Sequence, residues 1–271
     1  MPSMDGMKLP DFNYYDTIKE KCPASVELEI PGIKLELRRI FGSGDDADSV
    51  FNKHFSEWTE NIEWNLRARL AAGGVGYENG EDSILYEECE KHAGKYQKTL
   101  EAKSIVVVVH PFYLPLSHTR FLKTSEDLHE VKLYMNRFVG LLESNVAGND
   151  VGFVLLETIH HYAAATSLLL ERGLVDAVVF TLHDDGYPVR PADLEQFQGK
   201  PVYFCGGYFR GGCLSRLIGM IRNMPVPDER LFVIRDLILN TPRGSHLIPT
   251  TEDFEKEDFP ECRQIRSEML L

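Results

Sequence analysis

The stretch KPVYFCGGYFRGGCLSR, residues 200–216, decides the fold class, because it has the form of a buried strand, a glycine-rich loop and a helix start. The apolar run from Pro201 to Cys205 predicts the strand, and the helix is predicted to begin at Cys213. Glycine permits positive φ and a close approach of a ligand to the main chain, and a helix start offers unpaired N–H groups. This arrangement favours an anion, or a stabilised cysteine thiolate, at the loop.

Similar strand and helix patterns alternate on both sides of this stretch. Further strands are predicted at 104–109 (SIVVVV), 151–156, 175–182 and 230–235, and helices at 127–144, 159–172, 191–197 and 213–223. Such alternation implies right-handed crossovers and a mainly parallel sheet with helices on both faces. The predicted fold class is therefore α/β, a three-layer αβα sandwich with a mainly parallel sheet of five or six strands. We place it in residues 103–271 and expect a wrapping or loose tail from Asn240.

Residues 1–102 are predicted to form an N-terminal extension. Apolar and charged residues alternate at 26–30 and 33–37, on either side of Pro31-Gly32, which predicts a β-hairpin. Apolar side chains recur at helical spacing in 51–66 and 81–100, which predicts two helices. We expect these helices to roof part of the site described below.

Composition narrows the class of partner. The chain has 271 residues and a formal net charge of −13, which argues against a nucleic-acid backbone or an anionic membrane as the main partner. No apolar run approaches the roughly 20 residues of a membrane span, and the N-terminus lacks a secretory signal pattern. Five scattered cysteines without a C-x-x-C motif indicate a reducing compartment. We expect a cytoplasmic protein with a small-molecule substrate and neither a nucleic-acid nor a membrane partner.

Polar or titratable residues follow every predicted strand at its carboxyl end. They are His110 after the first strand, Glu157 and His160 after the second, His183 and Asp184 after the third, the loop to Cys213 after the fourth, and Asp236 after the fifth. In open parallel sheets, ligands bind beyond the carboxyl ends of the strands. The sequence therefore predicts an active site at this edge of the sheet.

The leading hypothesis is a hydrolase or group transferase that acts on a small polar or anionic molecule and requires no cofactor. The candidate catalytic residues are the nucleophile Cys213, the bases His110 and His183, and the orienting carboxylates Glu157 and Asp184. The candidate anion-binding residues are Arg210, Gly207, Gly211, Gly212, His160 and Arg120. Each also has a structural interpretation: Cys213 as a small core residue, for example, and His110 as a strand cap.

A cysteine at a helix start, after a glycine-containing strand exit, resembles the isochorismatase-type cysteine hydrolases. The resemblance implies an α/β fold and a cysteine nucleophile at Cys213. That family has an aspartate at the end of its first strand, where this chain has His110, and its catalytic lysine has no match here. The likeness is one of fold-level arrangement.

Three alternatives stay open. In the first, a divalent metal is the cofactor of a hydrolase, with ligands drawn from His110, Glu157, His160, His183 and Asp184. In the second, the glycine-rich loop and Arg210 bind a nucleotide or phosphate, although the loop matches neither G-x-G-x-x-G nor the Walker pattern. In the third, the chain is a non-enzymatic acidic binding or scaffold protein.

Overall fold

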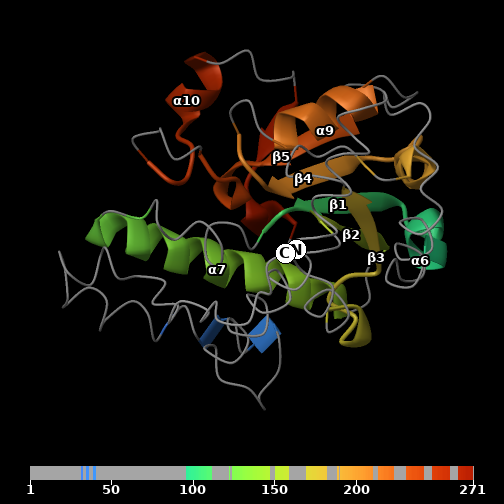
Figure 1. Ribbon diagram of the computed structural model, residues 1–271, viewed down its shortest axis with the longest axis horizontal. Helices are drawn as coiled ribbons and strands as arrows, with labels where there is room; N and C mark the ends of the chain where they lie inside the picture. The colour runs from blue at the N-terminus through green and yellow to red at the C-terminus, as the bar shows by residue number, and fades with distance from the viewer. Residues whose placement is uncertain are drawn as a thin grey trace, which may run out of the picture.

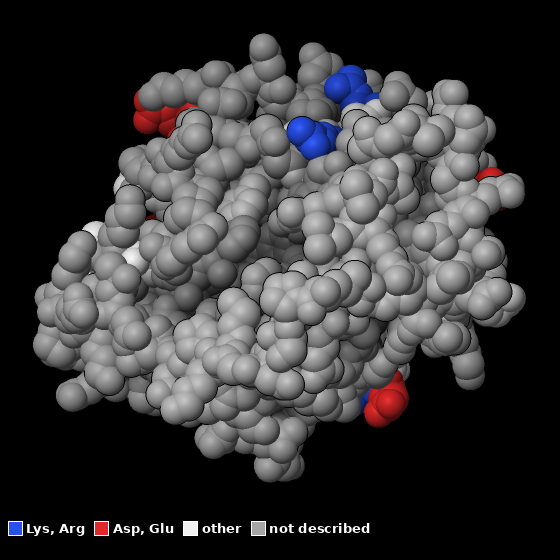
Figure 2. Space-filling model, in the orientation of Figure 1, with Lys and Arg blue, Asp and Glu red and all other residues white. Residues whose placement is uncertain are grey.

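The computed structural model is shown in Figure 1. It describes residues 32, 35–36, 39–40, 96–111, 122, 124–146, 150–158, 169–181, 188, 190–209, 213–222, 230–240, 246–256 and 262–270. None of the helices in these ranges is long and apolar enough to cross a membrane. On the face drawn in Figure 2, the described lysine, arginine and acidic side chains lie in small separate groups.

A six-stranded parallel sheet forms the centre of the fold, in the order β3-β2-β1-β4-β5-β6. The chain builds one half of the sheet from β1 outward, then returns to place β4 beside β1. The strand order therefore reverses between β1 and β4. The strands are β1 (Ser104–Val109), β2 (Val151–Thr158), β3 (Ala177–Thr181), β4 (Val202–Gly206), β5 (Leu231–Ile234) and β6 (Arg263–Ile265).

Helices cover both faces of this sheet, as Figure 1 shows for α7 (Ser125–Val146) on one side and α9 (Cys213–Arg222) on the other. The side chains of β1 alternate between them. Val106 and Val108 belong to the apolar cluster that includes α7, whereas the neighbouring residues of β1 belong to the cluster that includes α9. A strand buried on both faces reads as a continuous apolar run, which is why SIVVVV predicted β1 correctly. The α/β class, the layers and the parallel sheet are confirmed.

Helix α6 (Tyr96–Glu101) leads the chain into β1 and is held to the sheet by polar contacts. The Tyr96 hydroxyl donates to the carbonyl of Val178 at 2.9 Å, and Lys98 Nζ donates to Asp176 Oδ1 at 2.8 Å. This helix matches the end of the one predicted over 81–100, whose earlier residues lie outside the described ranges. The division of the chain at residue 103 stays a prediction.

The C-terminal tail is more ordered than the sequence suggested. It contributes α10 (Thr251–Lys256), β6 at the sheet edge and the 3-10 turn η7 (Ser267–Met269). The sequence of β6 is short and its side chains are largely exposed, so it lacks the apolar run that reveals a buried strand. The helix predicted at 191–197 is the 3-10 helix η4 (Pro191–Phe197), and a second 3-10 turn, η6 (Arg235–Leu237), follows β5. Of the helix predicted over 159–172, residues 169–172 are described; 169–171 are helical and Arg172 lies in a turn.

The prediction of a second hairpin strand at 33–37 is wrong at the residues that the structure describes. Leu35 and Glu36 are helical, as are Arg39 and Ile40. Helical backbone puts Glu36 and Arg39 on one face, where they form an ion pair at 2.6 Å, and α7 supplies Glu143 as a second partner of Arg39. These contacts with α7 override the local alternation, which suited a strand equally well. The remainder of the hairpin lies outside the described residues.

Candidate functional site

The site is built where β1, β2 and β4 end. Val109 is aligned with Leu156 on one side and with Gly206 on the other. His110, the first residue after β1, therefore stands level with Glu157, which lies within β2 and is aligned with Phe180 of β3. His110 Nδ1 lies 2.8 Å from Glu157 Oε1, and both side chains are completely buried. The structure thus brings together two of the predicted catalytic residues.

The backbone of His110 is strained. Its φ is +40°, and it is the one non-glycine residue with positive φ in the described part of the chain. A left-handed conformation costs an L-residue about 1–2 kcal/mol. Such strain persists only where the surroundings hold it, and it clusters at functional sites. Here the amide of His110 continues the β-ladder by donating to the carbonyl of Leu156 at 3.0 Å, while its ring is held by Glu157.

Tyr134 of α7 is a member of this site that was not among the predicted site residues. Its side chain is fully buried, and its hydroxyl lies 3.5 Å from the carbonyl oxygen of Pro111. Burial raises the pKa of Tyr134 well above its usual value, and electrostatic contributions add to this from Cys205, Tyr208, Glu157 and Cys213. A signal was present in the sequence, since a tyrosine on an apolar stripe carries a hydroxyl that seeks a polar partner.

The described part of the glycine-rich loop is held close to β1. Gly206 and Gly207 both have positive φ, +72° and +66°. A Cβ on Gly206 would lie 2.3 Å from the carbonyl oxygen of Val109, so only glycine fits there. Beyond them, the amide of Phe209 donates to the carbonyl of Leu239 at 2.8 Å, which ties the loop to the chain after β5.

Cys213 begins α9, as predicted, and a Cβ on Gly207 would lie 3.0 Å from its Sγ. The thiol is 1% exposed and packs in the apolar cluster on the α9 face. Cys205 belongs to the cluster on the α7 face instead. Burial, and then the nearby charge of Asp236, raise the pKa of Cys205, so this thiol stays protonated.

Two further polar side chains are buried near the carboxyl ends of strands. Thr181 closes β3, and Asn240 follows the segment after β5. Within the described ranges, the hydroxyl of Thr181 and both side-chain polar atoms of Asn240 have no hydrogen-bond partner. A buried polar group without a partner costs about 1–3 kcal/mol, so each of these groups calls for an explanation such as a bound molecule.

The other predicted site residues lie outside the described residues. They are His160, His183, Asp184, Arg120, Arg210, Gly211 and Gly212. Within the ranges that the structure describes, no group of three or more His, Cys, Asp or Glu side chains is close enough to hold a metal ion. The metal alternative depends on residues outside those ranges and stays a prediction.

Comparison with known proteins gives no match. The chain matches no protein-family model, no curated protein and no solved structure. Fold and site together define a parallel α/β protein with a buried histidine–glutamate pair at the carboxyl ends of β1 and β2.

Tyr134→Phe should reduce the loss of stability at alkaline pH. Because the pKa of Tyr134 is raised in the folded state, the unfolded chain releases this proton first, and stability falls as the pH rises above about 10. Phenylalanine removes that contribution. At pH 7 the variant should match the parent closely, since the hydroxyl–carbonyl distance of 3.5 Å is too long for a strong hydrogen bond. Urea unfolding at pH 7 and pH 10.5 measures both effects, and parallel losses in parent and variant would contradict the assignment.

Proposed function

We propose that this protein is an enzyme, a hydrolase or group transferase acting on a small polar or anionic molecule at the carboxyl edge of its sheet. The observation that carries the proposal is the fully buried His110–Glu157 pair, with His110 in a left-handed backbone conformation. His110 follows β1, the strand beside which the strand order reverses, and Rossmann-like doubly wound sheets bind their ligands at such a reversal. The polar groups buried at Thr181 and Asn240 add support.

In the proposed mechanism His110 is the general base. Glu157 accepts a hydrogen bond from Nδ1–H, which fixes the tautomer in which Nε2 carries the lone pair. Nε2 then takes a proton from the attacking group, either water or a substrate hydroxyl, and Glu157 stabilises the imidazolium that forms. The proton returns to the leaving group as the bond to it breaks. Loop residues Arg210, Gly211 and Gly212 are proposed to hold the substrate's anionic group.

Cys213 remains the candidate nucleophile in a second form of this mechanism. Its thiol packs in the apolar cluster on the α9 face of the sheet, and it also contributes, with Glu157 and Cys205, to the electrostatic surroundings of Tyr134. We favour direct attack by water or a substrate hydroxyl, because the His110–Glu157 pair supplies the base that this reaction needs. Retention of activity in Cys213→Ser and Cys213→Ala would support direct attack, and loss in both folded variants would favour the thiol.

One observation also favours the metal-dependent alternative. Histidines that bind metal usually donate their second ring N–H to a carboxylate, as His110 does in the tautomer assigned above. His160, His183 and Asp184 would then complete the site. Metal analysis of the purified chain distinguishes the two forms of catalysis. Stoichiometric zinc or manganese in the parent, lost in His110→Asn, would favour metal-dependent catalysis.

If the protein is instead a scaffold, the parent catalyses no reaction, and His110→Asn therefore abolishes none. Cytoplasmic location, inferred from the scattered cysteines, is part of the proposal.

The experiment uses His110→Asn, because asparagine tolerates a left-handed backbone while it removes the imidazole. The full chain is screened for hydrolysis of nitrophenyl esters, nitrophenyl phosphates and aminoacyl anilides. His129→Asn is the matched control, since this histidine lies on the exposed side of α7. We expect the parent and control to share an activity that falls about 100-fold or more in His110→Asn. Equal activity in all three proteins would contradict the proposal.

A further inference from the structure

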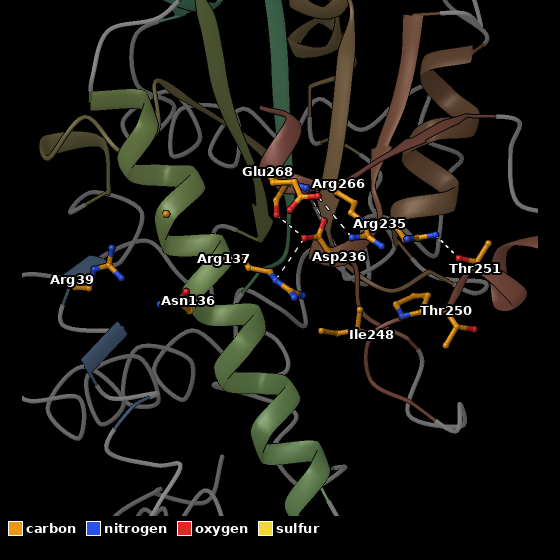
Figure 3. Close-up of a pocket in the computed structure, with 13 residues that line it drawn as sticks. Arg39, Asn136, Arg137, Arg235, Asp236, Ile248, Thr250, Thr251, Arg266 and Glu268 are labelled. Carbon is orange, nitrogen blue, oxygen red and sulfur yellow. Dashed lines mark hydrogen bonds and ion pairs between the residues drawn. The ribbon is translucent and has the colours of Figure 1, made fainter. Parts of the chain in front are cut away.

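A cavity lies away from the His110–Glu157 pair, between α7 and the ends of β5 and β6 (Figure 3). Its volume is about 710 Å³, within the range of small-molecule sites. Neither His110 nor Glu157 lines it. The lining includes four arginines, Arg39, Arg137, Arg235 and Arg266. Four guanidinium groups around one cavity are notable in a chain with a net charge of −13.

The negative side chains of this cavity are largely engaged elsewhere. Asp236 accepts hydrogen bonds from the Ser267 amide at 2.8 Å and from the Ser267 hydroxyl at 2.6 Å, one on each carboxylate oxygen. This carboxylate therefore ties η7 to η6, and Arg137 stays at 3.7 Å from it. Glu268 lies 3.8 Å from Arg266 with both side chains well exposed, so the pair contributes little. Arg39 is occupied by Glu36 and Glu143.

Three guanidinium groups are thus placed for an incoming anion. Figure 3 shows Arg137 and Arg266 beside Asp236, while the side chain of Arg235 extends toward Thr251. Arg137 belongs to α7, Arg235 to η6, and Arg266 directly precedes η7. Among the described residues, Arg235 has no carboxylate partner and donates to the hydroxyl of Thr251. Asn136, whose side-chain amide donates to Glu36 Oε1 at 2.9 Å, also lines the cavity, and Ile248 and Pro249 form part of its wall. It can therefore accept both an anionic group and an apolar body.

We infer that this cavity, which we call the arginine pocket, binds a phosphorylated small molecule. A phosphate group brings about two negative charges at pH 7 and three strong acceptor oxygens, enough to satisfy several guanidinium groups at once. The volume exceeds that of a bare phosphate, so the ligand carries a further body that packs against Ile248 and Pro249. The inference does not depend on the proposed reaction at His110.

Gly140 gives the pocket a steric test. It lies on the stretch of α7 that lines the cavity, and a Cβ added there meets no atom within 4 Å. A larger side chain at this position would therefore project into open space and fill the pocket without displacing its neighbours. Gly219 of α9 has the same free surroundings but does not line the pocket, so Gly219→Leu is the matched control for Gly140→Leu.

The test is titration calorimetry of the full chain with ADP, pyrophosphate and citrate at low salt. We expect ADP and pyrophosphate to bind more tightly than citrate. Arg235→Gln should weaken binding about 10-fold or more, as loss of a charge-assisted hydrogen bond does. Arg263→Gln removes the same charge from the exposed face of β6, outside the pocket, and should leave binding unchanged. Gly140→Leu should abolish binding, and Gly219→Leu should not.

Several outcomes would overturn the inference. Absence of binding by ADP and pyrophosphate at millimolar concentration would exclude a phosphate site. Tighter binding of citrate would assign the pocket to carboxylates instead. If Arg235→Gln and Arg263→Gln weakened ligand binding equally, the effect would come from the overall charge of the chain and not from the pocket. Thermal unfolding of each variant, measured without ligand, ensures that lost binding is not lost folding. Activity at the His110 site is measured separately, so the proposed reaction and the proposed ligand site can each be refuted without the other.

Discussion

Gly206→Ala is expected to lower the free energy of unfolding by about 2–5 kcal/mol, the sum of a left-handed alanine and an overpacked contact. The φ of Gly206 is +72°, and its new Cβ would lie 2.3 Å from the carbonyl oxygen of Val109. That oxygen belongs to the backbone of the central strand, so it cannot move away as a flexible side chain would. Urea unfolding followed by circular dichroism measures the change.

Gly199→Ala separates the two causes. Gly199 has almost the same φ, +71°, but a Cβ there meets nothing within 4 Å. We expect this variant to lose only about 1–2 kcal/mol, the cost of the backbone conformation. If Gly206→Ala lost no more than Gly199→Ala, the close approach of β4 to β1 at the site would be wrong.

His110→Ala has the second large expected effect, a loss of about 3–5 kcal/mol in the free energy of unfolding at neutral pH. The substitution takes away the imidazole that lies 2.8 Å from Glu157, whose carboxylate is completely buried. A buried carboxylate that loses its charged or hydrogen-bonded partner is costly, because water cannot replace that partner.

The double variant His110→Ala with Glu157→Gln tests this cause. A neutral amide needs less compensation than a carboxylate, so the second substitution should recover at least about 1 kcal/mol of the loss. Simple additivity of the two single substitutions would mean that the pair is not energetically coupled. In that case the 2.8 Å contact would not contribute to stability.

Most of the sheet could be predicted from the sequence because its strands are apolar on both faces. The run at 104–109 and the strand before Gly206 both stand where they were predicted. The elements that were missed do not depend on a buried apolar run. The strand β6 is an edge strand of three residues with largely exposed side chains. Residues 35–36 and 39–40 are helical through ion pairs and packing against α7, which no local pattern encodes.

The candidate site was predictable in part for a simple geometric reason. The carboxyl ends of parallel strands lie at one edge, so the residue after β1 and the last residues of β2 must meet there, and the register brings His110 beside Glu157. The contribution of Tyr134 was missed because it comes from the helix layer, and helical periodicity cannot tell a core residue from one that reaches a site. The arginine pocket was missed for the same reason, since its arginines are far apart in the chain.

The central claim is that Glu157 serves the chemistry of His110. The most direct test incubates the full chain with a small-molecule cell extract and follows consumption by mass spectrometry. Glu157→Gln is compared with Glu195→Gln, an exposed glutamate of η4. We predict that the parent and Glu195→Gln consume the same polar or anionic molecules, and that Glu157→Gln, still folded, consumes them about 100-fold or more slowly. Undiminished consumption by Glu157→Gln, or no consumption by the parent, would contradict the account.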